Sequence, residues 1–287
     1  MLFNLIAIIF LLICFWGVGG LFRPRFTSNR VLNPFQDVFL GIFLLSFFGL
    51  IVSFFYPLKM LMIDVFLLVL TTAGLYSQIK SWRVVKLSNE NIQFFAIWFF
   101  LLVSAFCLFM GYENYPYNTD TDYYHANAVT WLSEYGIIKG LANINLRIGF
   151  NTSWHVLAAL INKYYFLDRT SWIMPLVGYC SAIGYFLWEI AFTKRLWVKV
   201  YSFIIIQWTF LNILTWGFPS LHYDFVPLIY NAILLLIVLK IEITEEKIFF
   251  DDLIIIFIFS AASFILKPMG LVSVFYNALC WEKIDKS

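Results

Sequence analysis

Charged residues are scarce in this chain. Only 13% of its 287 residues are Asp, Glu, Lys or Arg, whereas 62% are hydrophobic and 21% are aromatic. A soluble domain carries about a quarter charged and about half apolar residues, so the composition excludes an ordinary soluble protein. It predicts an all-α protein, a polytopic bundle of transmembrane helices.

Cysteine is also rare, and no low-complexity linker or internal repeat is apparent. None of the four cysteines has metal-ligand spacing, and each lies in an apolar run, which is typical of small core residues. The missing repeat weighs against transporter folds built from two related halves. The cysteines are Cys14, Cys107, Cys180 and Cys280.

Long apolar runs fill most of the chain. A membrane-spanning helix needs about 20 apolar residues, and nine runs come near that length. The predicted spans are Leu2–Phe22, Phe35–Tyr56, Met60–Ile79, Ile92–Met110, Ser171–Phe192, Val200–Phe218, Tyr223–Leu239, Leu253–Leu266 and Met269–Trp281.

The run Trp154–Phe166 is too short for a span and contains His155 and Lys163, which is typical of an interfacial or re-entrant helix. If it does not cross, 13 of the 19 basic residues lie inside; if it crosses, nine lie inside and ten outside. The positive-inside rule therefore favours nine spans, with the N-terminus outside and the C-terminus inside. The inside set is Arg23, Arg25, Arg30, Lys80, Arg83, Lys86, Lys194, Arg195, Lys199, Lys240, Lys247, Lys283 and Lys286.

These spans divide the chain into three predicted parts. Residues 1–110 form a four-helix membrane segment, 111–170 form an outer loop with short surface helices, and 171–287 form the C-terminal membrane helices. The sequence stops directly after a short predicted span, which we expect of a chain truncated at its C-terminus.

The stretch Gly111–Asn151 is the longest part too polar for a bilayer. A helical pattern from about Tyr123 to Tyr135 follows Asn118 and Asp120, either of which is a suitable N-cap. Gly136 and Gly140 are expected to end that helix. Its predicted polar face is Tyr124, Asn127, Trp131 and Glu134, and its apolar face is Ala128, Val129 and Leu132.

Each polar residue of this stretch also has a simpler interpretation. Acids in an exposed loop are usually just solvated, and Asn143 and Asn151 suit loop turns and caps. His125 suits a helix surface, and Lys267 suits a helix end from which it reaches the interface. The pair Asp120 and Asp122 is similar to metal-binding pairs of nucleotide-sugar enzymes, which leaves a divalent metal open as a cofactor. The density of such groups in one loop favours a site.

Three segments together carry a resemblance: Asp120-Thr-Asp-Tyr-Tyr-His125, then Trp131 to Asn143, then Arg147-Ile-Gly-Phe-Asn151-Thr-Ser-Trp154. They resemble the first outer loop of the GT-C superfamily of integral membrane glycosyltransferases, and most closely bacterial multi-pass membrane proteins with an Asp-Thr-x-x-Tyr-His…Arg-x-Gly-Phe-Asn-x-x-Trp loop. Further on, Asp224 and the turn at Lys267 resemble outer-face positions of the aminoarabinose transferase group.

The resemblance implies sugar transfer, with inversion, from a polyprenyl-phosphate carrier to a glycan, lipid or protein acceptor at the outer face of a bacterial inner membrane. By this likeness Asp120 is the general base. No nucleic acid is expected among the partners. The implied substrate-binding residues are Asp122, Tyr124, His125, Arg147, Asn151, Asp224 and Lys267.

Two other classes stay open. A transporter or flippase for lipid-linked saccharides would carry charged residues within its spans, and Asp64 and Glu189 lie near the ends of theirs. A non-catalytic membrane subunit would leave the dense polar stretch without an explanation.

Overall fold

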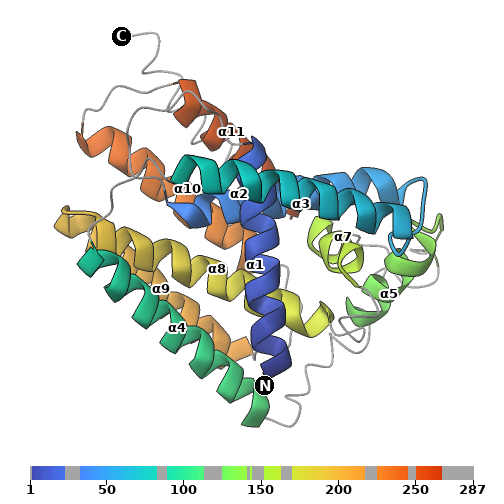
Figure 1. The fold of residues 1–287 in the computed structure, drawn as a ribbon, viewed down its shortest axis with the longest axis horizontal. Coiled ribbons are helices and arrows are strands. Elements are labelled where there is room, and N and C mark those ends of the chain that lie inside the picture. Colours follow the sequence, from blue (N-terminus) through green and yellow to red (C-terminus); the bar gives the residue numbers. More distant parts are fainter. Residues whose placement is uncertain are drawn as a thin grey trace. The chain divides into compact units, whose positions relative to one another are not determined.

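The computed structural model of the chain describes residues 2–22, 33–82, 89–112, 125–140, 143, 152–162, 170–216, 225–244 and 250–266. Over these residues it contains ten helices and no strand, which confirms the all-α prediction (Figure 1). The helices are α1 Leu2–Phe22, α2 Pro34–Ser53, α3 Leu61–Trp82, α4 Asn89–Tyr112, α5 Ala126–Tyr135, α7 Ser153–Leu160, α8 Thr170–Phe192, α9 Leu196–Trp216, α10 Phe225–Thr244 and α11 Phe250–Leu266.

Five of these helices are long and apolar enough to cross a membrane: α1, α2, α3, α8 and α10. The chain is therefore an integral membrane protein. Within the described residues, α4 and α11 hold shorter apolar stretches, Glu90–Leu102 and Leu253–Leu266. The count of nine spans stays a prediction, and the predicted span Met269–Trp281 lies outside the described residues.

The chain divides into two compact units. One comprises residues 1–22 and 31–221, and the other comprises 23–30 and 222–287. In the second unit α10 and α11 form an antiparallel pair, joined by the Tyr230 and Phe259 rings at 5.3 Å and by the Ser263 hydroxyl, which donates to the Pro227 carbonyl at 3.3 Å. The predicted division at residues 110 and 170 stays a prediction.

In the first unit α1 packs against α2 and α3 at glycines. A Cβ on Gly19 would fall on the Asp37 carbonyl, and a Cβ on Gly41 would fall on the α1 backbone. A Cβ on Gly74 of α3 would likewise overlap the carbonyl of Gly17. Small residues let helix backbones approach this closely. In a bilayer the lipid tails are as apolar as the side chains, so van der Waals contact at such positions, and not the hydrophobic effect, drives helix association.

The helix α8 lies at the centre of this unit, with every residue from Ile173 to Glu189 buried. It contacts α1, α2, α4, α7 and α9. Aromatic rings make much of this packing, and such pairs contribute about 0.5–1.5 kcal/mol beyond their area burial. The pairs are Phe39–Tyr185 at 6.3 Å, Phe95–Trp188 at 5.3 Å and Phe186–Tyr201 at 6.3 Å.

The two ends of α2 contact different parts of the chain. At its start, the Asn33 side chain caps the helix ahead of Pro34 and also donates to the Glu189 carboxylate of α8 at 3.2 Å. At its end, the Ser53 carbonyl accepts from the Ile137 amide, just after α5, at 2.7 Å. The turn between α2 and α3 therefore lies beside the end of α5.

Candidate functional site

The helix α5 forms one wall of the site. Ala128, Val129 and Leu132 are buried, as predicted, while Asn127 and Glu134 are exposed. Its start differs from the prediction. The helix begins at Ala126, His125 takes the N-cap position in a helical conformation without a side-chain cap, and Asn118 and Asp120 lie outside the described residues.

The end of α5 confirms the predicted break. Gly136 has a φ of +69° and Gly140 a φ of +83°, a region that L side chains rarely adopt. A Cβ on Gly136 would also come within 2.6 Å of the Ser53 carbonyl. Next to it, the Lys59 amide donates to the Ser133 carbonyl at 2.9 Å. Backbone hydrogen bonds thus hold α5 against the α2–α3 turn.

The helix α7 corrects the prediction for Trp154–Phe166. It begins at Ser153, after Thr152, whose side chain accepts from the His155 amide, and it ends at Leu160. Every residue of α7 is buried within the protein, which contradicts the interfacial alternative and leaves the re-entrant one. The reason is its sequence: apolar residues cover all sides from Val156 to Leu160, and such a helix is stable only in the interior. Residues 163–166 lie outside the described part.

A pair of buried imidazoles joins α5 to α7. His125 Nδ1 lies 2.7 Å from His155 Nε2, with ring centroids 4.8 Å apart. The side chains are 0% and 1% exposed. Since a neutral imidazole has one N–H and one acceptor nitrogen, one ring donates and the other accepts. If both rings were protonated, two N–H groups would face each other, so this contact holds at most one positive charge.

The distance between His125 Nδ1 and His155 Nε2 fits a hydrogen bond, in which the two nitrogens share one proton, better than two ligands of one metal ion. Two ligands of one tetrahedral zinc, each about 2.0–2.1 Å from the metal, would be about 3.3 Å apart. Among the residues that the structure describes, no three His, Cys, Asp or Glu side chains gather at metal-ligand distance.

Two further polar atoms lie in the first turn of α7. The Ser153 hydroxyl and the Trp154 indole nitrogen are both buried and find no hydrogen-bond partner within the described residues. The residues are 2% and 1% exposed. A buried indole N–H normally has an acceptor. The wall that carries His155 therefore also presents two hydrogen-bonding groups to its surroundings.

Of the predicted site residues, the structure describes His125 alone. It is buried against His155, which sequence reasoning placed only within an apolar run. The signal for His155 was there: an imidazole in an otherwise apolar helix has to be buried with a partner. The other predicted site residues lie outside the described residues: Asp120, Asp122, Tyr124, Arg147, Asn151, Asp224 and Lys267.

A second polar cluster, at the other end of α2, was not predicted. Asp37, 1% exposed in the first turn of α2, accepts a short hydrogen bond from the Gln78 side chain of α3. One turn earlier, Asn33 donates to the Tyr185 carbonyl at 2.9 Å and to the Glu189 carboxylate. Both buried acids are thus held by side-chain amides. Carboxyl groups inside membrane helices are costly and often functional.

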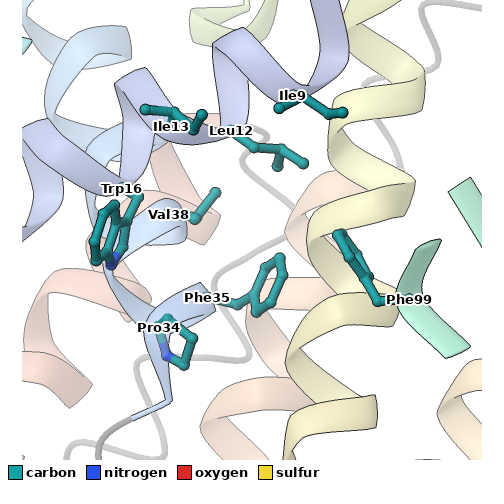
Figure 2. A pocket seen from close by; sticks show the side chains of 8 residues that line it. All are labelled: Ile9, Leu12, Ile13, Trp16, Pro34, Phe35, Val38 and Phe99. Carbon is teal, nitrogen blue, oxygen red and sulfur yellow. The ribbon is translucent and has the colours of Figure 1, made fainter. Parts of the chain in front are cut away.

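An apolar groove of about 270 Å³ lies beside this cluster, between α1, α2 and α4. Figure 2 shows Ile9, Leu12 and Ile13 of α1 above the rings of Phe35 and Phe99, which lie beside each other. Its lining carries hardly any polar surface, so it suits a hydrocarbon chain. The lining residues are Ile9, Leu12, Ile13, Trp16, Pro34, Phe35, Val38 and Phe99.

These features define a helical integral membrane protein with a buried polar site between two short helices at one end of its bundle. The family model described as a domain of unknown function, DUF8201, matches residues 1–287, so the chain belongs to that family. No curated protein and no solved structure matches the chain at a significant level.

Proposed function

We propose that this protein transfers a sugar from a polyprenyl-phosphate carrier to an acceptor at the outer face of a bacterial inner membrane. The acceptor hydroxyl attacks the anomeric carbon, and Asp120 takes the hydroxyl proton. The new C–O bond forms as the bond from the anomeric carbon to the phosphate oxygen breaks. Polyprenyl phosphate leaves with the bonding electrons, and the anomeric configuration inverts.

The contact between His125 and His155 supports this proposal most. His125 ends the Asp-Thr-Asp-Tyr-Tyr-His segment, and His155 directly follows the Arg-Ile-Gly-Phe-Asn-Thr-Ser-Trp segment. These segments are far apart in sequence, yet the two imidazoles lie within hydrogen-bond distance. A residue within the polar stretch therefore meets a residue just after it, which is expected if the two segments contribute to one site.

The chain geometry keeps the proposed groups near this contact. Asp120 is five positions from His125 in the sequence, and a fully extended chain of that length spans at most about 18 Å. Asn151 is four residues from His155, which limits it to about 14 Å. Arg147 and Lys267 are the proposed cations for the phosphate, since a leaving phosphate needs its developing charge stabilised.

The test is a transfer assay in membranes that contain the protein, with membranes that lack it as the control. Polyprenyl-phosphate sugars labelled in the sugar are supplied as donors. We expect labelled acceptor and free polyprenyl phosphate in equal amounts. Absence of both products across the common hexose, pentose and aminosugar donors would overturn the proposal.

A second candidate is transport of lipid-linked saccharides. The observation that favours it is the buried pair of acids, Asp37 and Glu189, each held by an amide within the helical bundle. Asp37, like Asp64 and Glu189, lies near the end of its span. The two functions differ in their products, because transport moves the donor across the bilayer intact whereas transfer releases polyprenyl phosphate.

A further inference from the structure

The first turn of α7 presents several hydrogen-bond donors together. The geometry of a helix leaves its first amides without intrahelical acceptors. Thr152 caps the His155 amide at 3.3 Å, which leaves the amides of Ser153 and Trp154 at the open end. The side-chain groups of these same two residues are the Ser153 hydroxyl and the Trp154 indole N–H, both buried and without a partner within the described residues.

The chemistry of these groups selects the kind of ligand. An indole N–H only donates, and helix amides only donate, so their partner has to be an acceptor. Side chains in a helix lean towards its N-terminus, so Ser153 and Trp154 lean towards the open amides. The helix dipole adds a partial positive charge there. An oxyanion with several acceptor oxygens satisfies all of these donors at once.

We propose that the first turn of α7 binds the phosphate of the lipid carrier, with Ser153 and Trp154 as its side-chain donors. This inference deepens the proposed function and takes the identity of the phosphate ester from it. A carboxylate or a sugar hydroxyl offers fewer acceptor oxygens. Phosphate is also the ligand whose charge would be complemented by Arg147, the proposed cation six residues before Ser153 in the sequence.

The test is binding of polyprenyl phosphate to the full chain in detergent micelles, with polyprenol, which lacks the phosphate, as the ligand control. Trp154→Phe keeps an aromatic ring but removes the N–H and part of the indole volume, and Ser153→Ala removes the hydroxyl. Each hydrogen bond to a charged phosphate is worth about ten- to a hundred-fold in affinity. We expect each variant to weaken polyprenyl phosphate binding by such a factor and to leave polyprenol binding unchanged.

Trp98→Phe is the matched control, because Trp98 lies on α4 and is 50% exposed. It should bind polyprenyl phosphate as the wild type does. Unchanged affinity in both Trp154→Phe and Ser153→Ala would overturn the inference.

The melting temperature of the ligand-free protein distinguishes a ligand-binding role of these groups from a structural one. Alanine nearly matches serine in volume, so Ser153→Ala leaves almost no cavity. If the Ser153 hydroxyl has no partner in the ligand-free protein, Ser153→Ala should keep or raise the melting temperature measured without ligand. If the hydroxyl instead bonds to another group of the chain, the variant should lower it, because a buried polar group loses its partner. A lower melting temperature in the absence of ligand would also overturn the inference.

The outcomes distinguish this inference from the proposed function. If the wild type binds polyprenyl phosphate through Trp154 but forms no transfer product, the site stands and the proposed reaction fails. If transfer occurs and Trp154→Phe leaves the KM for the donor unchanged, the reaction stands and this phosphate site fails.

Discussion

At the scale of single residues, the main feature of the candidate site is the contact between His125 and His155. Both rings are fully enclosed, and the hydrogen bond between them links the start of α5 to α7. In this setting each imidazole satisfies one nitrogen of the other. Loss of either ring leaves its partner with a buried polar atom, which costs about 1–3 kcal/mol.

A double-mutant cycle measures this contact. We expect His125→Ala and His155→Ala each to lower the melting temperature in detergent, and the double variant to lower it by clearly less than the sum. Residues in direct contact show coupling of about 0.5–3 kcal/mol. Thr130→Ala is the control, because Thr130 is exposed on α5 and bonds only to its own helix at 3.0 Å. Additive effects of the two histidine variants would contradict the contact.

Contacts between individual side chains were also the features least predictable from the sequence. It named His125 as a site residue but treated it as a candidate for the helix surface. It could not pair His125 with His155, because nothing in a linear sequence measures the distance between two short helices. Asp37 was overlooked for a different reason. It lies within a run that is otherwise apolar, and its amide partner, Gln78, comes from the next helix.

At the scale of elements, apolar runs predicted the long helices well. The structure has α1 over Leu2–Phe22, as predicted, and α8 starts one residue before the predicted span. The faces of α5 and its end at Gly136 were also predictable, since period and glycine chemistry are local properties. The burial of α7 was not predicted, because the run Trp154–Phe166 contains His155 and Lys163 and so also suited an interfacial helix, whereas the helix itself covers only Ser153–Leu160.

Close packing of α1 on α2 is the element-scale feature most open to test. Gly→Ala in a helix normally gains about 0.5–1 kcal/mol of intrinsic propensity. At Gly19 and Gly41 the new Cβ would meet the backbone of the opposite helix, and overpacking costs about 1–3 kcal/mol or more. The cost of overpacking exceeds the gain in helix propensity, so both alanine variants should lower the melting temperature.

Gly49→Ala is the matched control on α2. Its Cβ would approach a side-chain carbon of Val156 at 3.0 Å, and that side chain can shift by a few tenths of an ångström. We expect a much smaller change than at Gly41, measured by the same thermal unfolding in detergent. Equal loss at Gly49 and Gly41 would contradict backbone contact between α1 and α2.

At the scale of the whole molecule, the account depends on which end of the bundle faces out. The α2–α3 turn is bonded to the end of α5, whereas the turn between α8 and α9 follows Glu189 at the other end of α2. Placement of Lys and Arg in the sequence predicts that the first end lies outside and the second inside.

Cysteine labelling tests this orientation in intact cells, with the four native cysteines replaced. Tyr56 is 58% exposed in the α2–α3 turn, and Arg195 is exposed between α8 and α9. We expect Tyr56→Cys to react with an impermeant thiol reagent from outside. Arg195→Cys should react only after the membrane is permeabilised. Labelling of position 195 in intact cells would reverse the topology and move the polar stretch to the inner face.

The most direct measurement compares Asp120→Asn with Asp122→Asn in the transfer assay. Asparagine keeps the size and hydrogen bonding of aspartate but removes its basicity. A positioned general base contributes about 10²–10⁴ in rate, so Asp120→Asn should lose that factor while the protein still folds. Asp122→Asn should lose much less. Equal turnover in the wild type and Asp120→Asn would contradict the account, and a dead Asp122→Asn beside an active Asp120→Asn would assign the base two residues along the chain.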